Sequence, residues 1–180
     1  MLTEGGVPSS WTPDGRQLAY VNSSSGNDDI WVASLDSSGV TAKPLIHTPN
    51  SENYPEFSPD GRWLMYSSDV SGREEVYVQP YPGPGAPQQV SVDGGISPAW
   101  NPSGREIFFL SSLRPSDGRR DLMSVAAQLS PSLQLGRPQR LFSAPERSFL
   151  CSPTRCYSVT PDGQFFYTYQ APPGPRPGLP

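Results

Sequence analysis

The chain has 180 residues, a length that favours a single domain or part of one. Its net charge of −4 argues against nucleic acid as the main partner, because nucleic-acid binding usually needs a clustered basic surface. It contains no run of ~18 apolar residues, so no membrane-spanning helix is expected, and its first residues lack the basic and apolar segments of a signal peptide.

One turn sequence occurs four times in the chain. Each copy follows a short segment that ends in an apolar residue and precedes a strongly apolar run. The distances from Asp14 to Asp60 and from there to Ser103 are close to the ~40–45 residues of a four-stranded propeller blade. The distance on to Asp162 is longer and indicates an insertion. The repeated turn residues are Pro13, Asp14, Gly15, Pro59, Asp60, Gly61, Pro102, Gly104, Pro161, Asp162 and Gly163.

The chemistry of these residues predicts hairpin tips. Proline presets the first central position of a type I turn, aspartate bonds to nearby backbone, and glycine accepts the left-handed conformation that follows. A residue that is present in every copy is expected to be structural. Function is therefore expected where the copies differ.

Each turn predicts a strand on either side. The incoming strands end at Trp11, Phe57, Trp100 and Val159, and the outgoing strands cover residues 18–21, 63–66, 107–110 and 165–167. The outgoing strands are apolar on both faces, as expected where small sheets stack like blades. Third strands are predicted at residues 29–32, 75–78 and 121–125, and weaker fourth strands at 44–46, 88–92 and 139–142.

These elements predict an all-β fold, a partial β-propeller of three four-stranded antiparallel blades and a final hairpin. The blades cover about residues 7–48, 53–93 and 96–143, and the hairpin, as a partial fourth blade, covers about 155–170. No helical periodicity is present. The Pro/Gly-rich segment 171–180 is predicted to be an extended or disordered tail.

The pattern Pro-x-aromatic-Ser-Pro-Asp-Gly-Arg-x-Leu-x-Tyr, followed by a glycine and the third strand, resembles the WD-like repeat of TolB-type β-propellers. The copy from Tyr54 to Val78 matches it almost throughout. The stretch 53–95 also resembles propellers fused behind bacterial eukaryotic-like serine/threonine kinases. The resemblance covers about residues 1–170 and implies fold more than function. The third copy departs from the pattern at Ser103, and the fourth departs at Gln164 and lacks a third strand.

About half of a propeller is present, because closed propellers typically have 4–8 blades. The segment 92–100 overlays on 3–11 at a constant offset, so residues 1–3 are expected to end an earlier blade. Two interpretations are open: the chain is a piece of a longer protein, or it pairs with another copy or another subunit. Open sheet edges predict self-association of the isolated chain.

The only cysteines are Cys151 and Cys156, which are either bridged or free. The resemblance favours the bridge, because the family is often extracytoplasmic and disulfides persist in oxidising compartments. It also favours an extracytoplasmic (periplasmic) location if the chain is part of a larger exported or membrane-anchored protein. Two cysteines and one distant histidine, His47, do not make a zinc site. We expect no metal and no cofactor.

The acidic residues before the third strands invite a catalytic interpretation, but their recurrence argues for structure. One repeat position holds Asp29, Glu75 and Asp121. Another holds Arg16, Arg62 and Arg105. We predict a cross-strand pair between these positions in each blade, worth ~0.2–1 kcal/mol if exposed. No Gly-x-Ser-x-Gly elbow is present, so no hydrolase activity is expected.

Segments unique to one copy are the better candidates for binding, because loops on a rigid scaffold usually carry function. These segments are residues 79–87, 111–120 and 143–157. Their candidate binding residues are Tyr81, Arg114, Arg119, Arg120, Arg147 and Arg155.

The sequence thus favours a non-catalytic module that binds a protein, a peptide or a small ligand, as the C-terminal sensor or interaction part of a larger bacterial protein. Two alternatives are open. One is the substrate-gating propeller of a prolyl-oligopeptidase-type serine peptidase, and the other is a half-propeller that is completed by oligomerisation.

Overall fold

The computed structural model describes residues 6–146, 157–160, 162 and 164–167, which form antiparallel β-sheets. The first sheet consists of β1 (Val7–Trp11), β2 (Gln17–Asn22), β3 (Asp29–Asp36) and β4 (Gly39–Ile46). The second consists of β5 (Glu52–Phe57), β6 (Trp63–Ser68), β7 (Glu75–Pro80) and β8 (Gln88–Gln89). Within each of these sheets the strands lie in chain order.

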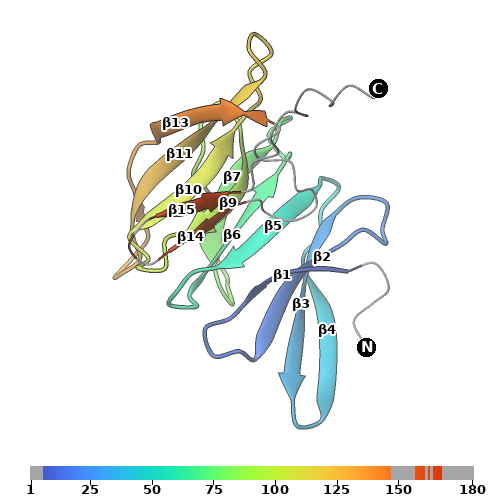
Figure 1. The fold of residues 1–180 in the computed structure, drawn as a ribbon. Coiled ribbons are helices and arrows are strands. Elements are labelled where there is room, and N and C mark those ends of the chain that lie inside the picture. Colours follow the sequence, from blue (N-terminus) through green and yellow to red (C-terminus); the bar gives the residue numbers. More distant parts are fainter. Residues whose placement is uncertain (1–5, 147–156, 161, 163, 168–180) are drawn as a thin grey trace, which may run out of the picture.

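In the third sheet, two strands pair with the outer edge of its third strand instead of one. Its inner strands are β9 (Gly95–Trp100), β10 (Glu106–Ser111) and β11 (Arg119–Gln128). The first part of β11 pairs with β13 (Gln139–Pro145), and its last residues pair with β12 (Gln134–Leu135). A final hairpin joins β14 (Tyr157–Val159) to β15 (Phe165–Tyr167). Figure 1 shows the three sheets following one another through the molecule, with the hairpin beside the third. The predicted fold class is confirmed.

The first three repeated turns adopt the predicted conformation. Gly15, Gly61 and Gly104 have φ values of 69°, 70° and 71°, in the left-handed region that glycine tolerates best. In the first turn, the Thr12 hydroxyl and the Arg16 backbone N–H both donate to Asp14 Oδ1, at 2.6 and 3.1 Å. The predicted ends of the incoming strands at Trp11, Phe57, Trp100 and Val159 are also confirmed.

The fourth strand of the second blade is shorter than predicted. The sequence suggested residues 88–92, whereas β8 ends at Gln89. The physical reason lies at Ser91, whose hydroxyl accepts a hydrogen bond from the Val76 backbone N–H at 2.8 Å. A side chain therefore takes the place of the next ladder bond.

The core lies between the sheets, because the outgoing strands β2, β6 and β10 are buried on both faces as predicted. Ala19 and Ile30 of the first sheet pack against Leu64 and Tyr66 of the second. The other face of the second sheet contributes Met65, Val76 and Val78 to a cluster with the third sheet. The final hairpin packs on the far face of the third sheet. No helix in the described ranges is long and apolar enough to cross a membrane.

Candidate functional site

Each sheet has a carboxylate end and a turn end. The carboxylate end is where the third strand begins, near Asp29, Glu75 or Asp121, and the turn end carries the repeated Pro-Asp-Gly turns. The predicted cross-strand pair between arginine and carboxylate is wrong. Asp29 lies opposite Asn22 at the end of β2, whereas Arg16 precedes β2 and its carbonyl accepts from the Leu35 N–H at the far end of β3. Antiparallel pairing therefore places the two repeat positions at opposite ends of the sheet.

In the second sheet the carboxylate is fully satisfied. Glu75 is 1% exposed. Its Oε1 accepts from the Arg73 guanidinium at 2.7 Å and from the Gly94 backbone N–H at 2.9 Å, and its Oε2 accepts from the Ser91 hydroxyl. A neighbouring arginine thus neutralises the buried charge, which is the condition for tolerating it.

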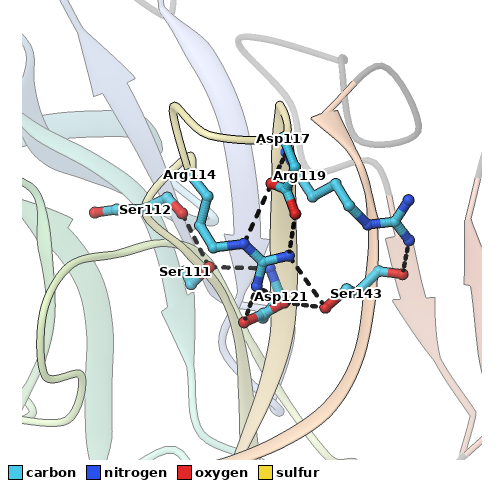
Figure 2. A network of polar contacts seen from close by, with 7 residues as sticks. All are labelled: Ser111, Ser112, Arg114, Asp117, Arg119, Asp121 and Ser143. Carbon is cyan, nitrogen blue, oxygen red and sulfur yellow. Dashed lines mark hydrogen bonds and ion pairs between the residues drawn. The ribbon is translucent and has the colours of Figure 1, made fainter.

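In the third sheet a different arginine pairs with the carboxylate, Asp121, which is partly buried. Figure 2 shows the Arg114 guanidinium between Asp117 and Asp121. Its Nη1 lies 2.8 Å from both carboxylate oxygens of Asp121, and its Nη2 lies 3.0 Å from Asp117 Oδ2. The Ser143 hydroxyl also donates to Asp121. The loop before β11 is therefore tied to β13.

The other two predicted arginines of this loop also have partners within the chain. Arg119 donates to the Ser143 carbonyl at 2.6 Å. Arg120 donates to the Ser111 carbonyl at 2.9 Å and to Glu146 Oε1 at 3.1 Å. These contacts support a structural role for the arginines, and their predicted role in binding stays a prediction.

Replacing Arg114 tests the structural role. We expect Arg114→Ala to lower the free energy of unfolding by ~1–2 kcal/mol, because it removes charge-assisted bonds that are partly exposed to solvent. Chemical denaturation measures the loss. The matched control is Arg105→Ala at the turn end, where the exposed side chain predicts a change within ~0.5 kcal/mol. Equal effects of the two variants would contradict a structural role for Arg114.

The first sheet lacks this arrangement. Asp29 Oδ2 lies 2.8 Å from His47 Nδ1 and accepts from the Ser25 hydroxyl at 2.5 Å, while no described protein group donates to the buried Oδ1. The position of Arg73 is held by Asn27, two residues before the carboxylate in both sheets. The Asn27 amide donates instead to the carbonyls of Thr48, at 2.9 Å, and Asn50.

A second carboxylate, Glu52, is buried beside the first. It begins β5 and is 1% exposed. Its Oε1 accepts from the Thr48 hydroxyl at 2.6 Å and from the Ser68 hydroxyl at 3.3 Å. Within the described part of the chain, no protein group donates to the buried Oε2. Burial raises the pKa of the Glu52 carboxyl, the two hydroxyl groups oppose the rise, and Asp29 and Asp69 add to it.

A cavity of about 580 Å³ lies between the first and second sheets, and its wall includes Glu52 but not Asp29. His47, Thr48 and Glu52 line its polar part. Tyr66 and Tyr77, whose ring centroids are 6.0 Å apart, line it along β6 and β7. Burial raises the pKa of the Tyr66 hydroxyl, which therefore stays neutral. Among the described residues, no group of three or more histidine, cysteine or acidic side chains is placed to hold a metal ion.

Sequence reasoning missed this cavity, although the sequence contained a signal. The junction before Trp100 was aligned with the junction before Trp11, and both have glycine five residues upstream, at Gly95 and Gly6. The corresponding residue before Phe57 is Glu52. Extending the alignment to the third junction would have identified a carboxylate that only one copy has.

The raised pKa of Glu52 predicts a pH-dependent effect of Glu52→Gln. The carboxyl is neutral in the folded and unfolded chain at pH below its ordinary value near 4.5, and it destabilises the fold as pH rises through the higher folded-state pKa. The groups that face it are Asp29, His47, Tyr66 and Asp69. We therefore expect the melting temperature of the variant, relative to the native chain, to be higher at pH 8 than at pH 4. A pH-independent difference, measured by thermal unfolding, would contradict this.

Tyr81 lies apart from the predicted arginines, at the turn end of the first two sheets. Its hydroxyl donates to Gln17 Oε1 at 2.8 Å, and its ring centroid is 4.7 Å from that of Phe57. It borders a smaller cavity of about 320 Å³ together with Asp14 and Asp60. The structure therefore does not bring the candidate binding residues into one site.

Several predicted residues lie outside the described ranges. They are Arg147, Arg155, Cys151, Cys156, Pro161, Gly163 and the segment 171–180.

The stacked four-stranded sheets and their repeated hairpin turns define the class of the protein as a β-propeller. The family model of the TolB β-propeller domain matches residues 4–138. The chain belongs to this family.

Solved structures show the same fold. The putative TolB from Agrobacterium tumefaciens is similar with a TM-score of 0.70 and 20% identity, over 93% of this chain and 59% of that one. TolB from Acinetobacter baumannii has a TM-score of 0.54 and 20% identity, over 76% and 33% of the two chains. A puromycin-hydrolyzing peptidase from Mycobacterium tuberculosis has a TM-score of 0.59 and 19% identity, over 86% and 26%. The chain thus spans about three fifths of the first structure and less of the others. No curated protein sequence matches it.

Proposed function

We propose that the chain is a non-catalytic binding module, the C-terminal sensor or interaction part of a larger bacterial protein, which holds a protein or peptide partner at its carboxylate end. The observation that carries the proposal is the cavity between the first two sheets. Its wall contains Glu52, a buried carboxylate with an oxygen that has no donor among the described residues. Such an atom usually has a partner, so a group from outside the chain is the natural occupant.

The chemistry of the wall favours binding over catalysis. Asp29 and His47 form a pair like the one that activates a nucleophile in hydrolases. However, the hydroxyls of Thr48 and Ser68 in the cavity wall donate to Glu52 and not to His47. Neither is therefore held as the nucleophile that such a pair activates. The likeness to the peptidase is a likeness of fold and carries no activity over to this chain.

The test uses immobilised random peptides and two variants. Val70 lines the cavity and is 57% exposed, while Val92 is 63% exposed and lies outside its wall. We expect the chain to bind a subset of the peptides without cleaving them. Val70→Trp should lower that affinity at least tenfold, and Val92→Trp should leave it unchanged. Cleaved peptides, the absence of binding, or equal effects of the two substitutions would overturn the proposal.

The alternatives make different predictions. A half-propeller completed by oligomerisation predicts a defined dimer in sedimentation and a melting temperature that rises with protein concentration. A substrate-gating propeller predicts a hydrolase domain encoded downstream.

A further inference from the structure

Comparing the three sheets identifies what is missing at the junction between the first and the second. Each third strand begins near a carboxylate, and in two sheets an arginine contacts it: Arg73 lies 2.7 Å from Glu75, and Arg114 lies 2.8 Å from Asp121. Among the described residues, the ionic partner of the first sheet's carboxylate, Asp29, is His47 alone. The described part of the chain therefore supplies an arginine to this carboxylate position in two sheets and only a histidine in the first.

Two sequence differences produce this charge imbalance. Asn27 replaces the arginine and is held in place by its bonds to the carbonyls of Thr48 and Asn50. Glu52 replaces a glycine and adds a second carboxylate. At the corresponding Gly95 a Cβ would lie only 2.5 Å from the Ser91 Cβ, so a side chain does not fit there. The junction between the first and second sheets has space for a side chain, and Glu52 places a carboxylate there.

Both carboxylates have an unused acceptor. Asp29 Oδ1 and Glu52 Oε2 are buried and receive no hydrogen bond from the described protein groups. Leaving a buried acceptor unsatisfied is costly, and more so for a charged group. Of the two residues, Glu52 lines the cavity. A positively charged donor in the cavity can therefore form a charge-assisted hydrogen bond, the stronger kind, with its carboxylate.

The rest of the cavity wall suits a short apolar arm behind such a donor. Leu45 and Ile46 line one side, and the rings of Tyr66 and Tyr77 line the other. Aromatic faces also attract cations. A volume of about 580 Å³ holds a group of the size of an arginine or lysine side chain with room to spare.

We propose that this cavity binds a guanidinium or primary ammonium group on a short apolar arm, which gives Glu52 in its wall, and Asp29 behind His47, the positive charge that Arg73 and Arg114 give to the other sheets. The proposal rests on the proposed function in taking the cavity as the binding site, and it names the chemistry of the occupant. The cation belongs either to a side chain of a partner peptide or to a small molecule.

The first experiment titrates the chain with n-butylguanidine and with n-butylurea, its neutral isostere, by calorimetry. We expect the guanidine to bind at least tenfold more tightly. Glu52→Gln should lower its affinity about tenfold or more, because it removes the charge-assisted acceptor in the wall. Asp29→Asn should lower it by less, because it removes only a nearby negative charge. The matched control, Asp36→Asn, removes an exposed carboxylate of the same sheet and should leave the affinity unchanged. Equal binding of guanidine and urea, or equal effects of all three substitutions, would overturn the proposal.

A second variant supplies the cation within the chain. Asn27→Arg places an arginine at the position of Arg73, and its guanidinium beside Asp29 should repel the cation of the ligand and weaken butylguanidine binding at least tenfold. The melting temperature shows whether the variant is folded. A folded Asn27→Arg chain that binds the guanidine as before would contradict the proposal.

The source of the cation is distinguished by a second pair of probes, random peptides that contain arginine and the same peptides with citrulline. Preference for the arginine peptides over both citrulline peptides and free butylguanidine identifies a peptide side chain. Binding of butylguanidine but of no peptide supports a small-molecule ligand and contradicts the proposed partner while leaving the cation site intact. Binding of both peptide sets equally, with no binding of butylguanidine, leaves the binding module intact and overturns the cation site.

Discussion

Phe108→Ala is expected to lower the free energy of unfolding by about 3–5 kcal/mol and to release the β14–β15 hairpin from the third sheet. Phe108 is 2% exposed, and its ring meets that of Phe165 edge to face with 4.6 Å between centroids. It packs in one cluster with Tyr157 and Val159 of the hairpin. Removing the ring therefore leaves a cavity where the hairpin is held. Denaturation measures the loss, and hydrogen exchange of the β14–β15 amides measures the release.

The neighbouring residue is the matched control for this change. Phe109 is equally buried but faces the second sheet, in a cluster with Met65 and Val76. Phe109→Ala should therefore cost a similar amount of stability while the amides of β14 and β15 keep their protection relative to the rest of the sheet. The proposed packing is wrong if both variants release the hairpin, or if neither does.

The second large effect is a contrast between two glutamates at the same depth. Glu75→Gln should lower the free energy of unfolding by about 1.5–3 kcal/mol at pH 7, because the charge that binds Arg73 and the Gly94 N–H is lost. Glu52→Gln should lower the free energy of unfolding little or raise it, because no arginine or lysine among the described residues pairs with Glu52 and no described group donates to its Oε2.

Chemical denaturation of the two variants measures the difference between their free energies of unfolding. Both residues are 1% exposed, so burial cannot account for a difference between them. A loss of similar size in both variants would show that Glu52 is as well paired as Glu75, and would remove the basis of the cation site.

The parts of the fold that depend on local chemistry were predictable from sequence. The left-handed glycines, such as Gly15 and Gly61, and the strand ends at Trp11 and Phe57 depend on residues adjacent in the chain. Apolar residues on both faces of the outgoing strands predicted stacked sheets, because each face needs a partner. The fold follows from such local and periodic signals.

Pairing between side chains was not predictable in the same way. Matching repeat positions suggested that Arg16 pairs with Asp29, yet register places them at opposite ends of the sheet. The actual partners, such as Arg114 for Asp121, come from loops of different length and have no common sequence offset. Glu52 was visible in the sequence, but its burial and its lack of a donor depend on how Thr48 and Ser68 are placed in three dimensions.

The order of strands within each sheet has a consequence for synthesis of the chain. In the first sheet every pairing joins strands that are consecutive in the chain, from β1 with β2 to β3 with β4. Such contacts close short loops, which keeps the entropic barrier to forming them small. We therefore expect the first sheet to assemble on the ribosome as soon as Ile46 leaves the exit tunnel, and each later sheet to form on the exposed face of the one before it.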